Sequence, residues 1–276
     1  MRRMLSSGSS MRRRRPPTAG LALAVLLLAR SARAVDPFEI QVYDGTADTP
    51  GVFGLELHLN RVATGHADAD PPELPLRGQT HVTLEPSYGV LPWWEVGAYF
   101  QTALRADGRF TYAGVKLRSK FVTPPSFDPH FRLGINLEVS LLPEAYDRSR
   151  YGSEIRPIAA WQDEHWLFVV NPIVDLGLAG PGLHEGPVFE PAAKIARSFA
   201  EVFAVGAEYY GSLGPIASPL PLAAQTHAIF GVVDIEAFHD LELELGLGGG
   251  FTAASAGLTG KIIVGYSFDL RKAASR

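Results

Sequence analysis

Apolar and polar residues alternate with a period of two along most of the chain that follows residue 52. The clearest run covers residues 131–141, where the apolar positions are Phe131, Leu133, Ile135, Leu137, Val139 and Leu141. Shorter runs of the same kind lie at 53–60, 115–121 and 241–248. Successive side chains of a β-strand point to opposite faces, so this alternation predicts strands with one apolar and one polar face.

Twelve segments carry this pattern, and most of them are 10 to 14 residues long. They span residues 53–64, 79–90, 93–105, 109–122, 130–142, 153–163, 165–178, 186–198, 202–213, 222–236, 241–252 and 257–268. Strands of globular proteins usually have about 5–6 residues, whereas a tilted strand needs roughly 9–11 residues to cross a membrane. We therefore predict an all-β fold, a transmembrane antiparallel up-and-down β-barrel of about 12 strands.

Two features fit this pattern less well. Four prolines fall inside predicted strands, where each removes a backbone donor, and we expect β-bulges to accommodate them. These prolines are Pro86, Pro157, Pro172 and Pro191. The segment 222–236 alternates least, because Ile229 and Phe230 are adjacent and both apolar.

The connections between the predicted strands alternate between tight turns and longer loops. Outer-membrane barrels show this asymmetry, with the short turns on the periplasmic side. All four tryptophans lie beside predicted tight turns, where aromatic side chains suit the interface between lipid and water. The expected interfacial aromatic rim consists of Trp93, Trp94, Trp161, Trp166 and Phe268.

The first 34 residues have the pattern of a signal peptide. Arginines precede an apolar stretch at 21–29, and Ala32-Arg33-Ala34 matches an A-x-A cleavage site after Ala34. This leader holds eight of the 25 basic residues and none of the 29 acidic ones, which leaves 17 basic against 29 acidic, a net charge of −12. Such a balance argues against nucleic acid as a partner. The chain has no cysteine, which excludes disulfides and thiolate chemistry.

The predicted organisation therefore has four parts. Residues 1–34 are the signal peptide, 35–52 an N-terminal periplasmic segment, 53–268 the barrel and 269–276 a C-terminal tail. A closed barrel is the arrangement of strands that satisfies all backbone groups in lipid. We expect the protein in the bacterial outer membrane, with outer-membrane lipid as its surroundings and a small-molecule solute as its partner.

A turn motif adds a resemblance. The opening strand Phe53-Gly54-Leu55-Glu56-Leu57 and the later stretch 85–97, with Glu85-Pro86 and Trp93-Trp94, resemble the outer-membrane β-barrel transporter family grouped with phenol-degradation meta-pathway proteins. The aromatic end of the last strand at Phe268 also resembles such barrels, although eight residues follow it here. The resemblance implies a barrel with an uptake role and provides no catalytic residues.

With apolar faces toward lipid, the polar faces point into the barrel. A lumen basic wall is expected from three successive strands, consisting of Lys116, Arg118, Lys120, Arg132 and Arg156. A lumen acidic wall is expected from the first and last strands, consisting of Glu56, Glu85, Glu95, Asp234, Glu236, Glu242 and Glu244. Two interpretations follow: opposed walls that sort solutes in an aqueous pore, or a salt-bridge network that fills a narrow lumen.

Catalytic and metal chemistry find little support. No histidine of the predicted strands has a serine two residues away, and the G-x-S-x-G motif is absent. His58 and His81 are expected to face each other near Glu56 and Glu85, which suits a cation, but a solvated pair is the simpler interpretation. We expect no enzyme activity, no cofactor and no metal.

Three functions agree with these patterns. The first is a channel or uptake porin for small solutes with a charged lumen. The second is a closed structural or interaction barrel of the envelope without transport. The third is a soluble periplasmic β-sandwich that binds a ligand.

Overall fold

The computed structural model describes residues 36–65, 71–124, 126–199, 202–238 and 241–269. The predicted leader and most of the predicted C-terminal tail lie outside these residues. Within the described ranges, no helix combines the length and the apolar character needed to cross a membrane.

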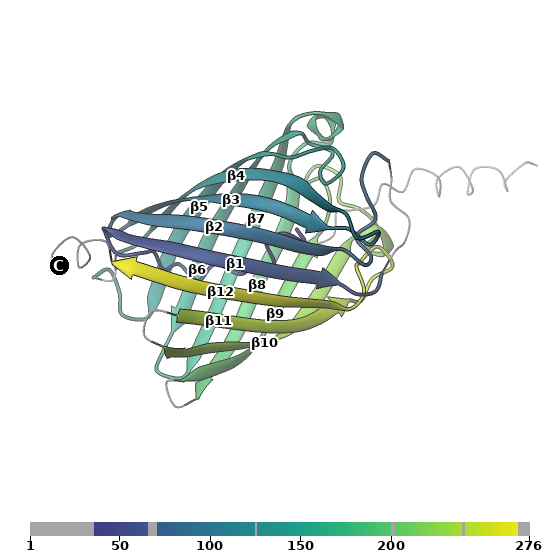
Figure 1. Ribbon diagram of the computed structural model, residues 1–276. Coiled ribbons are helices and arrows are strands. Elements are labelled where there is room, and N and C mark those ends of the chain that lie inside the picture. The colour runs from purple at the N-terminus through teal and green to yellow at the C-terminus, as the bar shows by residue number, and fades with distance from the viewer. Residues whose placement is uncertain (1–35, 66–70, 125, 200–201, 239–240, 270–276) are drawn as a thin grey trace, which may run out of the picture. The chain divides into compact units, whose positions relative to one another are not determined.

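Twelve antiparallel strands form a closed barrel in which each strand pairs with its neighbours in the sequence and β1 pairs with β12 (Figure 1). The strands are β1 Val52–Val62, β2 Thr80–Leu91, β3 Trp94–Leu104, β4 Phe110–Val122, β5 Phe131–Leu141, β6 Tyr151–Gln162, β7 Trp166–Ala179, β8 Val188–Phe199, β9 Phe203–Ser212, β10 Thr226–Phe238, β11 Leu241–Gly250 and β12 Thr259–Asp269. The predicted fold is confirmed, and closure of the sheet excludes the two-sheet sandwich.

The two ends of the barrel differ in their connections. The short-turn end carries the links β2–β3, β4–β5, β6–β7, β8–β9 and β10–β11. The links β2–β3 and β10–β11 are the shortest, and β4–β5, from Val122 to Phe131, is the one longer link at this end. The long-loop end carries the other links, which include the short 3₁₀ helices η1 Pro181–His184 and η2 Leu222–Ala224. The alternation of turns and loops along the sequence is therefore present in the structure.

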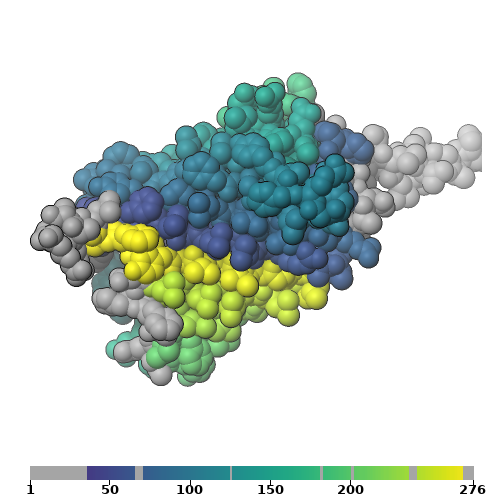
Figure 2. Space-filling model, viewed as in Figure 1, coloured from purple at the N-terminus to yellow at the C-terminus, as the bar shows by residue number. Residues whose placement is uncertain are grey.

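The outer surface of the barrel is rich in apolar side chains, which alternate with buried polar ones. On β5, for example, Leu133, Val139 and their apolar neighbours are exposed, whereas Asn136 and Glu138 are buried. Figure 2 shows this outer face where β12 lies against β1. A continuous exposed apolar surface of this kind is unusual for a protein in water and suits a lipid environment.

The strand prolines interrupt pairing on one side without forming the expected bulges. Pro86 pairs with Leu55 of β1, but the pairing of β2 with β3 omits Glu85 and Pro86. Pro157 likewise pairs with Ile135, while β6 and β7 are unpaired around it. Pro172 and Pro191 face each other across β7 and β8, so neither faces a backbone donor. The bulges lie elsewhere, for example between Gly89 and Leu91.

Candidate functional site

Residues 36–51, here called the lumen segment, pass through the inside of the barrel before β1 begins. Near its start, Phe38 packs against His81 and against Tyr146 of the β5–β6 loop, at the long-loop end. Near its finish, Gly51 donates a backbone hydrogen bond to Gly89, close to the short-turn end. The expected periplasmic segment 35–52 therefore lies within the barrel over its described residues.

Between residues 37 and 44, backbone groups of the lumen segment bond to side chains of the barrel wall. The Asn171 side chain accepts from the Tyr43 amide at 2.8 Å and donates to the Tyr43 carbonyl at 2.9 Å. Five further wall side chains donate to backbone carbonyls of the lumen segment. They belong to Asn60, Thr83, Lys261, Arg156 and Arg132. Buried backbone groups need such partners, so the wall side chains fix the course of the segment.

The apolar side of the lumen segment packs on an apolar part of the inner wall. Ile40 and Val42 are buried and share one hydrophobic cluster with inward residues of five strands. The wall members are Ala160, Val169, Ile173, Ala192, Tyr210, Ala228, Phe230 and Val232. The inner face of β10 is therefore apolar from Ala228 to Val232, which explains the weak alternation of this strand in the sequence.

The polar side of the lumen segment centres on Glu39, whose carboxylate is fully buried. Its Oε1 lies 3.0 Å from Arg156 and its Oε2 lies 3.2 Å from Lys116. The Tyr43 hydroxyl also donates to Oε1, at 3.1 Å. Charge-assisted bonds of this kind are the strong ones in a protein interior.

Tyr43 also fills the lumen between several cationic side chains. The guanidinium of Arg156 lies 4.4 Å from the centre of the ring, and Lys120 and Arg118 lie 5.5 and 5.9 Å from it. Each such contact contributes roughly 0.5–2 kcal/mol, depending on how far it is desolvated. The ring therefore joins the lumen segment to β4 and β6 at mid-height.

The residues of the predicted basic wall lie on β4, β5 and β6, with side chains that are buried or half-buried inside the barrel. Lys116 and Arg132 pair with Asp36 and Asp44 of the lumen segment, at 2.7 and 3.0 Å. Arg118 pairs with Glu95 of the neighbouring strand β3 and with Glu85 of β2, and Lys120 pairs with Glu95.

The predicted acidic wall divides into two groups. Glu85 and Glu95 are buried against β4, while Glu56 is half-buried beside His58. On the other side, Asp234 and Glu244 pair with Lys194 of β8, and Lys261 of β12 pairs with Glu208 and Glu244. Glu242 is exposed on β11, and Glu236 lies outside the residues whose side chains the structure describes.

These pairings differ from two walls of opposite charge across an open pore. Acids and bases that project into the same part of the lumen neutralise each other, often from strands that are not adjacent in the barrel. The lumen segment supplies further acids. The sequence pattern places both kinds of residue on inward faces, but the partners depend on strand register and on a segment outside the barrel strands.

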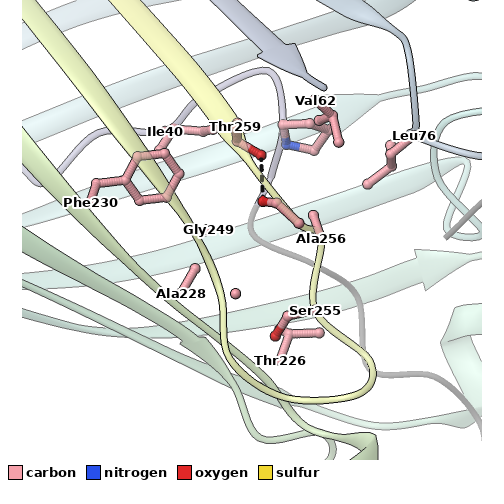
Figure 3. Close-up of a pocket in the computed structure, with 13 residues that line it drawn as sticks. Ile40, Val62, Leu76, Thr226, Ala228, Phe230, Gly249, Ser255, Ala256 and Thr259 are labelled. Atoms are coloured by element: carbon pink, nitrogen blue, oxygen red, sulfur yellow. Dashed lines mark hydrogen bonds between the residues drawn. The ribbon is translucent and has the colours of Figure 1, made fainter. Parts of the chain in front are cut away.

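A small cavity lies between the lumen segment and the wall near the long-loop end (Figure 3). Ile40 and Phe230 lie side by side at one edge of it, and the rest of its lining includes Val62, Leu76 and the loop at Ser255. The space open to the centre of a water molecule is about 20 Å³, enough for roughly one water. This part of the lumen is therefore filled.

The predicted aromatic rim lies at the short-turn end of the barrel. Trp93, Trp94 and Phe121 are stacked with ring centres 6.1–6.4 Å apart. Trp161 and Trp166 both contact Phe168, and Phe268 contacts Phe53 and Tyr266. Trp93, Trp166 and Phe268 are among the exposed large side chains of the barrel.

Asp48 offers a prediction about pH. Its carboxylate accepts from the Ser87 hydroxyl at 2.7 Å, and burial raises its pKa, with nearby Glu95 acting in the same direction. Because the pKa of Asp48 is higher in the docked state, protonation at low pH stabilises docking of the lumen segment. This stabilisation is lost as the pH rises through the pKa of the docked state. We expect Asp48→Asn, which keeps the acceptor, to dock more firmly at pH 7 and to open with less dependence on pH.

Hydrogen exchange of the amides at 38–43 at pH 5 and pH 7 measures this effect. The matched control is Asp44→Asn, which removes the charged partner of Arg132 and should loosen the segment slightly, because this pair is partly exposed. Faster exchange in Asp48→Asn than in Asp44→Asn at pH 7 would contradict the prediction.

Solved outer-membrane barrels share this fold. The COG4313 outer membrane channel from Pseudomonas putida F1 is 9% identical over 83% of this chain and 100% of its own, with a TM-score of 0.58. KdgM porin is 8% identical over 78% of this chain and 99% of its own, with a TM-score of 0.54. NanC porin is 8% identical over 78% of this chain and 98% of its own, with a TM-score of 0.51. The fold is that of outer-membrane porins and channels.

No family model and no curated protein sequence matches the chain. The resemblance to barrels is therefore supported at the level of the fold. The narrower likeness to the phenol-degradation grouping rests on the sequence motif at 85–97.

Proposed function

We propose that this protein is an outer-membrane channel for small solutes whose lumen is closed by its own lumen segment. The carrying observation is that the interior contains a continuous, non-strand piece of chain held by side-chain contacts. The ladder of β1 to β12 is complete without it, so the segment can leave the lumen while the barrel stays closed in lipid.

The contacts that hold the segment also suit a reversible closure. Asp36 and Asp44 make their ion pairs with side chains about one-third exposed, and such pairs are worth little against water. Glu39 and Tyr43 make the buried contacts at mid-height. A few strong contacts flanked by weak ones would keep the segment in the lumen at rest and still allow it to leave.

The charged lumen belongs to the same proposal. When the segment leaves, Lys116, Arg132 and Arg156 lose carboxylate partners and face water, which then gives part of the pore a positive potential. The chain is proposed to work as a channel rather than an enzyme, with its signal peptide removed after Ala34. The motif at 85–97 remains the reason to group it with the phenol-degradation barrels.

A closed structural barrel is the second candidate, and the dense ion pairing of the interior favours it. Single-channel recording of the folded full chain in planar bilayers separates the two. We expect a low resting conductance with brief openings. In a separate assay, we expect liposomes that contain the protein to swell in the presence of small charged and neutral solutes. A folded chain that never conducts at any voltage would contradict the channel and support the closed barrel.

A further inference from the structure

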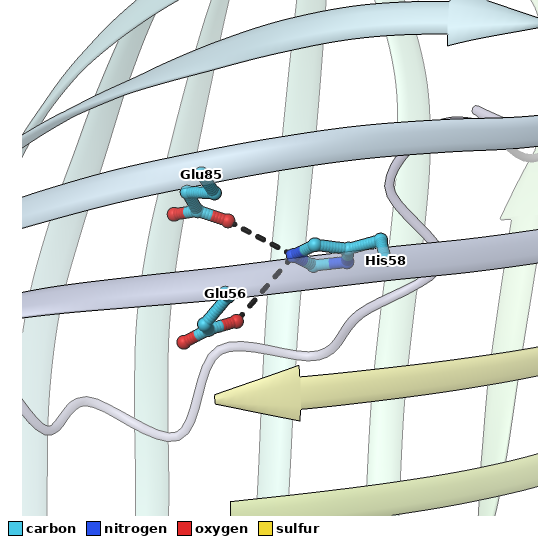
Figure 4. Close-up of side chains that lie close together, drawn as sticks. All are labelled: Glu56, His58 and Glu85. Carbon is cyan, nitrogen blue, oxygen red and sulfur yellow. Dashed lines mark hydrogen bonds and ion pairs between the residues drawn. The ribbon is translucent and has the colours of Figure 1, made fainter. Parts of the chain in front are cut away.

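Three potential metal ligands meet on the inner wall where β1 and β2 run side by side. The Nε2 atom of His58 lies 3.1 Å from Glu85 Oε2 and 3.4 Å from Glu56 Oε2. Glu56 and Glu85 are direct partners in the β1–β2 register, so both carboxylates reach the same point. Figure 4 shows the imidazole pointing between the two carboxylates. His81, expected from sequence to join this group, packs on Phe38 instead.

The spacing of these atoms suits a tetrahedral ion. Bonds of about 2.0–2.2 Å to nitrogen and oxygen place neighbouring ligand atoms roughly 3.3–3.5 Å apart around zinc. The two distances from His58 Nε2 are already close to this separation, and one atom from each of the three residues lies within 4.8 Å of the others. One imidazole and two carboxylates form a donor set typical of Zn²⁺.

The ligand side chains are oriented by hydrogen bonds to residues around them, as the ligands of metal sites in proteins usually are. Arg118 Nε donates to Glu85 Oε1 at 2.7 Å, which leaves Oε2 directed toward His58. Such partners fix the direction of a ligand carboxylate and tune its affinity for metal.

Gln41 of the lumen segment supplies an independent observation. Its amide nitrogen donates to Glu56 Oε2 at 3.2 Å, while its Oε1 is buried and finds no hydrogen-bond partner among the described residues. Leaving a buried carbonyl oxygen unsatisfied costs about 1–3 kcal/mol. Rotation of the amide by half a turn directs this oxygen toward the cluster, where a cation would satisfy it as a fourth ligand.

We infer that Glu56, His58 and Glu85 bind a divalent cation of the zinc class, with Gln41 completing the site. The side chain of Glu56 is 32% exposed, whereas those of His58 and Glu85 are 0% and 2% exposed, so the ion enters past Glu56. The imidazole must be unprotonated at Nε2 to bind: a neutral ring then carries its proton on Nδ1, whereas an imidazolium releases one proton to solvent. The three wall ligands belong to β1 and β2 and do not depend on whether the barrel conducts.

The test is a titration of the folded full chain in detergent with Zn²⁺, followed by calorimetry in two buffers of different ionisation enthalpy. The affinity tag must lack histidine. We expect one equivalent bound per chain at pH 7, and comparison of the two buffers gives the number of protons released. His58→Gln should weaken binding at least tenfold, and His81→Gln, a second buried histidine of the same wall, should leave it unchanged. Migration of the unheated barrel on denaturing gels confirms that each variant is folded.

Two substitutions at one position make the test sharper. Gln41→Glu adds a third carboxylate and should tighten binding, whereas Gln41→Ala should weaken it by less than His58→Gln does. A protonated His58 held by two carboxylates, with no metal, is the alternative. Two outcomes would overturn the inference. In one, the wild-type and His58→Gln chains bind the same amount of zinc with the same affinity, and in the other neither chain binds zinc.

Discussion

Removal of residues 36–48 is expected to raise the single-channel conductance several-fold. These residues occupy the lumen from Phe38 near the long-loop end to Asp48 near the short-turn end. The wall cations that they cover are then solvated by water in a wider pore, so the loss of partners does not leave buried charges. The barrel ladder does not include these residues and should close as before.

The same deletion should shift ion selectivity toward anions. Residues 36–48 hold four acidic residues, Asp36, Glu39, Asp44 and Asp48, and no basic one. Their removal therefore uncovers Lys116, Arg132 and Arg156 without adding negative charge. Reversal potentials in a salt gradient measure the shift, and addition of the synthetic peptide 36–48 should restore the low conductance. A folded deletion variant that conducts like the full chain would rule out closure by this segment.

Replacement of Glu39 by glutamine is expected to have the largest effect of any single substitution in the lumen segment. Glu39 is buried between Arg156 and Lys116, and removal of one partner from a buried ion pair costs about 3–5 kcal/mol. We expect the lower end, about 3 kcal/mol, because Arg156 keeps Glu154 and Lys116 keeps Glu138. That free energy corresponds to roughly a hundredfold increase in the ratio of open to closed segment.

Open probability in bilayers and hydrogen exchange at residues 38–43 both report this ratio. Asp36→Asn is the matched control, because the Asp36 side chain is 34% exposed and pairs with Lys116. Partly exposed pairs contribute about 0–1 kcal/mol, so its effect should be small. Equal effects of Glu39→Gln and Asp36→Asn would show that the buried pairs do not hold the segment.

Strand positions could be predicted from sequence because alternation between lipid and lumen repeats at every second residue. The expected segment 130–142, for example, differs from β5, Phe131–Leu141, by one residue at each end. The largest displacement occurs at the start of β10, which begins at Thr226 because residues 222–224 form η2. The strand propensity of individual residues does not show where a loop ends and the following strand begins.

The lumen segment was not predicted, although it leaves two traces in the sequence. One is the alternation of Phe38, Ile40 and Val42 with Glu39 and Gln41, which is too short to distinguish from a loop. The other is the pair Ile229 and Phe230 in β10, where Ile229 is exposed and Phe230 is buried against Ile40. A strand that is apolar on both faces of a barrel indicates that something apolar lies inside.

The direct link between the lumen segment and β1 has a kinetic consequence. Gly51, with a φ of +84° and a backbone bond to Gly89, joins the segment to the wall with almost no spare chain. A displaced segment therefore remains within a few nanometres of its binding groove, at an effective concentration on the order of millimolar. Rebinding of the segment should be fast, so we expect brief openings that occur in short bursts. Each passing solute then competes for the lumen with a segment that stays tethered to the barrel.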